Sequence, residues 1–130
     1  MSNRTHFGSC HCGRVRFEVD AEPVLRVTSC NCSICNRTGF LHLIVSTDRF
    51  QLLAGDEYLK SYRFNTGTAN HLFCSVCGIK AFYVPRSHPD GISVNARCID
   101  QDTVESLIVE QEFDGRNWEQ HAHELATLGN

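Results

Sequence analysis

The sequence predicts an all-β domain made of small antiparallel sheets, followed by a short helix near the C-terminus. Apolar and polar residues alternate with a period of two in several short segments, which is typical of half-buried strands. Gly, Pro and Asn residues separate these segments, as turns separate strands. The 130-residue chain has the length of one domain, and residues 1–130 contain neither a linker nor an internal repeat.

The expected strands follow one another along the whole chain. The first follows a tight turn within residues 7–20, where Val15, Phe17 and Val19 alternate with polar neighbours until Pro23 breaks the pattern. Further strands are expected over residues 24–27, 41–45, 58–64, 79–84, 92–98 and 107–111. Asn117 is expected to cap the terminal helix, one side of which carries Trp118, His121, Ala122 and Leu125.

Two pairs of cysteines far apart in the chain make one complete set of zinc ligands. In Cys74-Ser75-Val76-Cys77-Gly78 two thiolates leave one turn, and the glycine relieves the backbone where the loop doubles back. Cys10 and Cys12 supply the other pair. Structural zinc is nearly always closed by four protein ligands, so the two pairs together predict a structural zinc site. Such a site contributes on the order of 10 kcal/mol, comparable with the whole stability of a domain.

A third cluster places three thiols, those of Cys30, Cys32 and Cys35, within six residues at a strand end. Three interpretations are open. The favoured one is a catalytic zinc with an open fourth position. The second is another structural zinc, closed by a histidine (His42 or His71) or by Cys98, although Cys98 is expected to be a core residue on the apolar face of residues 92–98. The third is a metal-free redox centre formed by Cys32 and Cys35.

Electrostatics indicates what an open three-thiolate site would bind. Zinc with three thiolates already has a net negative charge, so it lowers the pKa of a bound water less than a three-histidine site does. Hydrolysis is therefore disfavoured. An outside thiol would still bind so soft an ion, be held as a thiolate and keep its nucleophilicity. The cluster thus predicts a thiol substrate, and Arg37, just beyond it, is a candidate for binding a substrate carboxylate.

Composition excludes some classes of partner. The formal net charge of −3 is not concentrated in runs of one sign, so we expect neither nucleic acid nor a membrane surface as a partner. Residues 1–6 lack the apolar segment of a secretory signal, and no apolar stretch approaches the roughly 20 residues that span a bilayer. We therefore expect a cytoplasmic protein, in which cysteines are mostly metal ligands rather than disulfides. The oligomeric state is not predicted.

Three motifs resemble the glutathione-dependent formaldehyde-activating enzyme family, which also includes centromere protein V. They are Gly8-Ser9-Cys10-His11-Cys12-Gly13-Arg14-Val15-Arg16-Phe17, Cys30-Asn31-Cys32-Ser33-Ile34-Cys35 and Phe73-Cys74-Ser75-Val76-Cys77-Gly78. The resemblance implies a small all-β fold of the Mss4-like type with two zinc ions. By motif, Cys10, Cys12, Cys74 and Cys77 would hold the structural ion, and Cys30, Cys32 and Cys35 the catalytic one.

The activity that the resemblance implies is the condensation of formaldehyde with glutathione to S-hydroxymethylglutathione, classed as a carbon–sulfur lyase reaction. Family members often carry two basic residues directly after the last cysteine of the triad, whereas Asn36 precedes Arg37 here. Two other functions stay open: a noncatalytic zinc module that binds a protein partner, and a carrier that binds glutathione without turnover.

Overall fold

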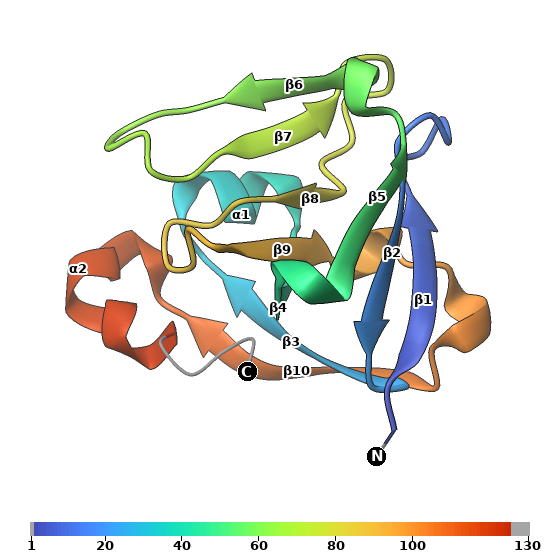
Figure 1. Ribbon diagram of the computed structural model, residues 1–130. Coiled ribbons are helices and arrows are strands. Elements are labelled where there is room, and N and C mark those ends of the chain that lie inside the picture. Colours follow the sequence, from blue (N-terminus) through green and yellow to red (C-terminus); the bar gives the residue numbers. More distant parts are fainter. Residues whose placement is uncertain (1, 126–130) are drawn as a thin grey trace.

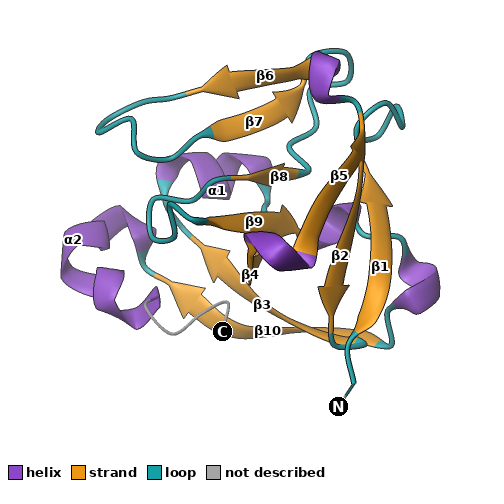
Figure 2. Cartoon of the chain, viewed as in Figure 1, coloured by secondary structure: helices purple, strands orange, loops and turns teal. Residues whose placement is uncertain are grey.

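Short strands dominate the computed structural model, which describes residues 2–125 (Figure 2). The strands form three small sheets. A three-stranded sheet has the order β1-β2-β5, a five-stranded sheet the order β10-β3-β4-β9-β8, and β6 and β7 form a hairpin of their own. The strand bounds are β1 Arg4–Ser9, β2 Arg16–Ala21, β3 Val24–Cys30, β4 Leu41–Ser46, β5 Phe50–Ala54, β6 Leu59–Tyr62, β7 His71–Cys74, β8 Phe82–Tyr83, β9 Gly91–Asn95 and β10 Ser106–Phe113.

Within residues 2–125, helical structure is limited to short pieces. Two α-helices lie at the ends of β3 and β10, namely α1 (Ser33–Thr38) and α2 (Trp118–His121). Single 3-10 turns lie at Thr47–Arg49, Asp56–Tyr58, Ala96–Cys98, Gln101–Thr103, Gly115–Asn117 and Ala122–Leu125. The predicted fold class, small sheets with a short helix near the C-terminus, is therefore confirmed.

One pairing differs from the expected antiparallel arrangement. β10 runs parallel to β3, from Ser106 opposite Val24 to Phe113 opposite Cys30. A parallel neighbour requires a long crossover, and here residues 31–105 lie between the two strands. Figure 1 shows the consequence: the orange β10 lies beside the blue β3, and both lead toward α1 and α2. The C-terminal segment thus reaches the cluster of three cysteines.

The core lies between the sheets and confirms the alternation seen in the sequence. Val15, Phe17 and Val19 are fully buried, whereas Arg14 and Arg16 are exposed. Phe17 packs against Phe50 of β5 and Phe82 of β8, and so links the three-stranded and five-stranded sheets. Each large apolar side chain buried in this way contributes about 1.5–3 kcal/mol.

Several element boundaries differ from those expected. β1, β5 and β7 were not predicted. The expected strand over residues 58–64 is only the four residues of β6, and that over residues 79–84 only the two residues of β8. The expected strand over 92–98 ends at Asn95, and Cys98 lies in a 3-10 turn, where it packs against the core as predicted. Asn117 precedes α2 but caps nothing: its amide donates to Asp114.

The polar side chains of β9 are buried. Ser93 and Asn95 are both covered, because β9 is an inner strand between β4 and β8. Among the described residues, no helix is long and apolar enough to cross a membrane.

Candidate metal centres

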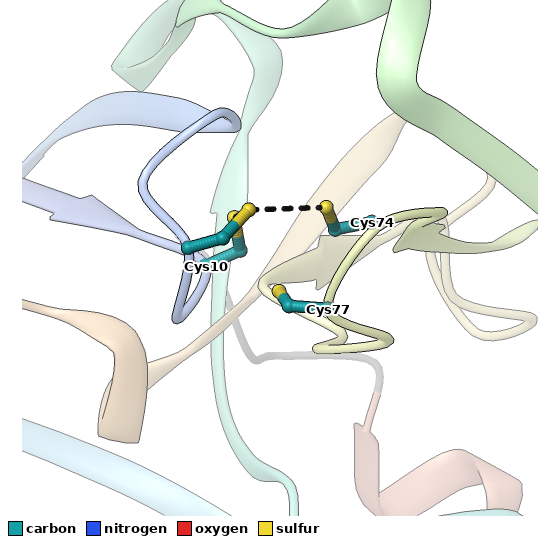
Figure 3. A group of neighbouring side chains, drawn as sticks. Cys10, Cys74 and Cys77 are labelled. Carbon is teal, nitrogen blue, oxygen red and sulfur yellow. Dashed lines mark hydrogen bonds between the residues drawn. The ribbon is translucent and has the colours of Figure 1, made fainter.

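Cys10, Cys12, Cys74 and Cys77 meet where two loops face each other. One loop joins β1 to β2 and the other follows β7, and Figure 3 shows the side chains of Cys10, Cys74 and Cys77 gathered between them. The Sγ atoms of Cys10 and Cys12 are 3.6 Å apart, and those of Cys12 and Cys74 are 3.7 Å apart. Four sulfurs at about 2.3 Å from a tetrahedral zinc ion would lie about 3.8 Å from one another. The four thiols therefore have the spacing that such an ion requires.

The two loops have the same construction, which explains why these short motifs place their sulfurs alike. In the first, Cys10 N donates to Val15 O at 3.0 Å, and Val15 N points at Cys10 Sγ at 3.4 Å. In the second, Cys74 N donates to Ile79 O at 3.0 Å, and Val76 N points at Cys74 Sγ at 3.4 Å. The chain reverses through glycines with positive φ, +82° at Gly13 and +77° at Gly78, as the sequence motif predicts.

The surroundings of this group lower the pKa of one thiol, that of Cys12. Hydrogen bonding from the Arg14 backbone, followed by the Arg14 side chain, lowers the pKa of Cys12 to about 6. Burial raises the pKa of Cys10 to about 11. Metal binding would have to displace the proton of Cys10, and a dication at the centre supplies the charge that makes this favourable.

Cys30, Cys32 and Cys35 come together at the junction of β3 and α1. Their Sγ atoms lie within 4.8 Å of one another, and this group and the four-cysteine group are the sets of metal-ligating side chains that the described residues form. Helix α1 was not predicted, yet it creates the cluster. Cys32 is its N-cap, with Sγ accepting from Cys35 N at 3.4 Å, and one turn later the helix carries Cys35 inward.

The three thiols lie too close to one another to ionise independently. Hydrogen bonds from Cys30 and then Cys35 lower the pKa of Cys32 to about 2, while hydrogen bonds to Cys30 and Cys32, together with burial, raise the pKa of Cys35. One thiolate thus forms at the expense of its neighbours. A bound dication removes this competition, so the donor set fits a soft metal ion.

His42 contacts the cluster from outside and is not a fourth member of it. Its Nε2 lies 3.2 Å from Cys35 Sγ, and its Nδ1 lies 2.9 Å from Ser93 Oγ and 3.3 Å from the Tyr83 hydroxyl. The Ser93 and Tyr83 hydroxyls and the Cys35 sulfur thus occupy both nitrogens of the ring. His71 and Cys98 also lie outside the group, and none of the eight cysteines forms a disulfide.

The backbone at Gly115 closes one side of the cluster. A Cβ atom at this position would lie 2.5 Å from Cys30 Sγ and 2.8 Å from Cys32 Cβ. The φ angle of Gly115 is not positive, so the glycine is required by close approach rather than by conformation. The parallel pairing of β10 with β3 brings it there, because Phe113 lies opposite Cys30.

The cluster forms part of the wall of a pocket of about 640 Å³. Other parts of the wall come from the loop between β6 and β7, from residues after β8, and from the segment containing α2. This volume lies within the usual range of small-molecule sites. The four cysteines of the other group do not line it.

The cationic side chains along the pocket are Arg86 and Arg116, not Arg37. Arg37 is exposed on α1, where its Nη1 donates to Ser33 O at 2.9 Å. Arg86 stacks on Trp118, with Cζ 3.7 Å from the ring centroid, and pairs with Glu119. Arg116 binds Asn31 O through Nε at 3.2 Å, which places its side chain next to the cluster.

A buried lysine and a buried histidine near the cluster were not singled out as a pair from the sequence. Lys80 Nζ lies 2.7 Å from His71 Nδ1, and Lys80 and His71 are 7% and 5% exposed. Burial lowers the pKa of Lys80 to about 8, and the nearby thiols act in the opposite direction. The available signal in the sequence was the position of Lys80, three residues after Cys77. A fully buried lysine is rare unless it has a partner.

Comparison with known proteins adds the following. Residues 5–113 match the model of a family described as glutathione-dependent formaldehyde-activating enzyme. A Halomonas elongata protein named "Putative glutathione-dependent formaldehyde-activating enzyme" is 32% identical over 103 residues, which covers 73% of this chain and 66% of the relative. This chain thus spans slightly less than two thirds of that relative. A crystal structure of a Rhodobacter sphaeroides protein matches with a TM-score of 0.66 and 32% identity, over 79% of this chain and 99% of that chain.

Proposed function

The chain belongs to the glutathione-dependent formaldehyde-activating enzyme family, and from this premise we propose that it is a zinc enzyme that adds glutathione reversibly to an aldehyde such as formaldehyde. The reaction would be of the carbon–sulfur lyase type. Two zinc ions per chain would have different tasks. Cys10, Cys12, Cys74 and Cys77 would hold a structural ion, and Cys30, Cys32 and Cys35 a catalytic one.

The observation that carries this proposal is the difference between the two cysteine groups. Four thiols at tetrahedral spacing can close the coordination of one ion. Three thiols, with no fourth ligand among the described residues, lie in the wall of a pocket. An ion bound by three thiolates would hold the sulfur of an incoming thiol as a nucleophilic thiolate.

The chain's own groups would bind the rest of the thiol and exclude water. Glutathione is a tripeptide with a central cysteine and a carboxylate at each end, so its sulfur and its carboxylates must be bound at separated points. Arg116 lies beside the cluster and Arg86 lies further along the wall, and either guanidinium can hold a carboxylate with two parallel hydrogen bonds. The role first expected for Arg37 passes to these two residues in our proposal.

Calorimetry of glutathione binding tests the proposal. We expect the zinc-loaded wild-type chain to bind glutathione, and the Cys32→Ser variant to lose this binding while it keeps one zinc ion and a cooperative thermal transition. S-methylglutathione is the matched control, because it retains both carboxylates but has no thiol to ionise. Equal binding of the two ligands would contradict the thiol site, and no binding of either would favour a noncatalytic module.

Catalysis is tested separately from binding. With formaldehyde and glutathione at neutral pH, the wild-type chain is expected to accelerate formation of S-hydroxymethylglutathione over the spontaneous reaction, as measured by exchange NMR. Binding without acceleration would instead identify a glutathione carrier.

A further inference from the structure

We propose that His71 gives a proton to the aldehyde oxygen as the thiol adds, and that Lys80 replaces this proton on the other nitrogen of the imidazole ring. The inference rests on the proposed function and deepens it, because it names the proton donor of the same site. It makes His71 a catalytic residue and Lys80 a positioning residue that also stores the proton.

The ring of His71 is held so that only one edge remains for a ligand. Phe64 stacks on the ring at a centroid distance of 5.3 Å with an interplanar angle of 23°, and Tyr83 stacks at 4.9 Å with an angle of 12°. Nδ1 is occupied by Lys80 Nζ at 2.7 Å. His71 nevertheless lines the pocket, as do Phe64 and Tyr83.

The remaining nitrogen, Nε2, belongs to a ring that lines this pocket. Among the described residues, Nε2 has no hydrogen-bond partner, whereas every side-chain nitrogen or oxygen that is inaccessible to solvent does have one. Nε2 is therefore accessible to solvent. An ammonium group has donors only, so Lys80 donates to Nδ1 and the neutral ring carries its proton on Nε2. Burial, followed by the charge of Lys80, lowers the pKa of His71 to about 4, which keeps the ring neutral at pH 7.

Lys80 is suited to supply the proton. Its Nζ lies 3.8 Å from the ring centroid of Tyr83 and 5.1 Å from that of Phe40, and among the described residues no carboxylate lies within 4.0 Å of it. The negative groups that act on it are the thiols of the three-cysteine cluster. Burial lowers its pKa to about 8, which is close to working pH and therefore favourable for proton transfer.

The proposed step balances in atoms and charge. The thiolate sulfur of the substrate forms a bond to the aldehyde carbon, and the electron pair of the C=O double bond moves to oxygen. This oxygen takes the proton of His71 Nε2, while Nδ1 takes a proton from the Lys80 ammonium group. A thiolate, an aldehyde and an ammonium thus become a hydroxyalkyl thioether and a neutral amine. Lys80 regains its proton by the reverse route when the next thiol ionises on binding.

Other polar groups in the pocket are less suited to this role. Both nitrogens of His42 have partners, namely the Ser93 and Tyr83 hydroxyls and the Cys35 sulfur. Arg86 and Arg116 are assigned above to the carboxylates of the thiol substrate. Burial raises the pKa of Tyr83, because it favours the neutral phenol. Tyr83 is therefore a weaker acid than an ordinary tyrosine.

Two substitutions, each with a matched control, test the proposal in the zinc-loaded chain. His71→Gln preserves a donor near Nε2 but cannot relay a proton, and Lys80→Met preserves length but has no proton to give. His123→Gln and Lys60→Met make the same changes at exposed positions. We expect both test variants to bind glutathione and two zinc ions as the wild type does, and to lose about 100-fold or more in kcat for glutathione addition to formaldehyde. The controls are expected to keep wild-type kcat.

The pH profile gives a readout that a merely structural role would not move. At saturating glutathione, kcat of the wild type is expected to fall as the pH rises through about 8, because Lys80 must be protonated to supply the proton. The titratable groups that face Lys80 are His71 on β7, Tyr83 on β8 and the three thiols at the junction of β3 and α1. Lys80→Met should lose this descending limb.

Nitrogen NMR of the histidine rings provides a test that does not depend on activity. The His71 resonances, assigned by their loss in His71→Gln, should show the proton on Nε2 at pH 7. A proton on Nδ1 instead, or wild-type kcat in both test variants, would overturn the inference and leave the proposed function standing. Should either variant fail to fold, the other variant and the wild-type tautomer still decide. Absence of catalysis by the wild type would overturn both proposals.

Discussion

At the three-cysteine cluster, the effect of a single residue depends mainly on how closely it approaches the sulfur atoms. Gly115 is the clearest case, because its backbone passes so near the cluster that a methyl group would overlap Cys30 Sγ. Gly39 offers a contrast. It ends α1 with φ of +66°, and a Cβ there would meet nothing within 4 Å. Gly115 is therefore required because a side chain there would overlap the cysteine cluster, whereas Gly39 is required by its backbone conformation.

The two glycines predict opposite results on substitution by alanine. Gly115→Ala is expected to weaken zinc binding at the three-cysteine cluster by about 10- to 100-fold, since it displaces Cys30, and to leave the other ion in place. Gly39→Ala is expected to retain both ions and to lower the Tm by about 4 °C, because a left-handed alanine costs about 1 kcal/mol. Competition with a chromophoric chelator and thermal melting measure the two effects. Unchanged zinc affinity in Gly115→Ala would contradict the close approach.

At the scale of elements, the segment after β10 forms one side of the pocket through few contacts. Arg86 stacks on Trp118 of α2, and the Arg86 guanidinium also pairs with Glu119. The Glu119 side chain is 79% exposed, so this ion pair is screened by water and contributes at most about 1 kcal/mol. The stacked pair contributes up to about 2 kcal/mol when desolvated, and Trp118 also supplies buried apolar area. Trp118 is thus the main anchor.

This ranking predicts how glutathione binding responds to substitutions in α2. Trp118→Ala is expected to raise the Kd for glutathione by about 3- to 30-fold, because Arg86 loses its support. Glu119→Gln is the control and should change the Kd by no more than about threefold. Calorimetry on both variants gives the comparison, and a larger effect of Glu119→Gln would show that the ion pair is the anchor instead.

The sequence predicts strands and the grouping of the cysteines better than it predicts how elements meet. The alternation of Val15, Phe17 and Val19 and the spacing of the four paired cysteines are local patterns, and both predict the observed arrangement. The parallel pairing of β10 with β3 is a contact between distant segments, and no local pattern encodes it. Gly115, Arg116 and Trp118 reach the pocket only through that pairing, so they could not be recognised beforehand. Helix α1 was missed because its six residues are too few to display a helical period.

At the scale of the whole molecule, the four-cysteine group joins loops about 60 residues apart and connects the three-stranded sheet to the β6–β7 hairpin. An ion there would contribute on the order of 10 kcal/mol, as much as the folded domain as a whole. The three-cysteine cluster lies within one short segment, from the end of β3 to α1. It therefore adds little to the connection between sheets.

Chelation should accordingly proceed in two steps. The ion of the three-cysteine cluster borders the pocket and has fewer protein ligands, so it is expected to leave first, with no loss of β-structure by circular dichroism. Loss of the second ion should coincide with unfolding. Release of both ions in a single step together with unfolding would contradict this order.

The difference in task between the two cysteine groups is tested most directly by measuring zinc per chain and thermal unfolding in Cys74→Ser and Cys32→Ser side by side. We expect Cys74→Ser to be unfolded or insoluble, and Cys32→Ser to hold one zinc ion and to melt cooperatively close to the wild-type temperature. A soluble Cys74→Ser variant with normal melting, or a Cys32→Ser variant that unfolds, would contradict the account.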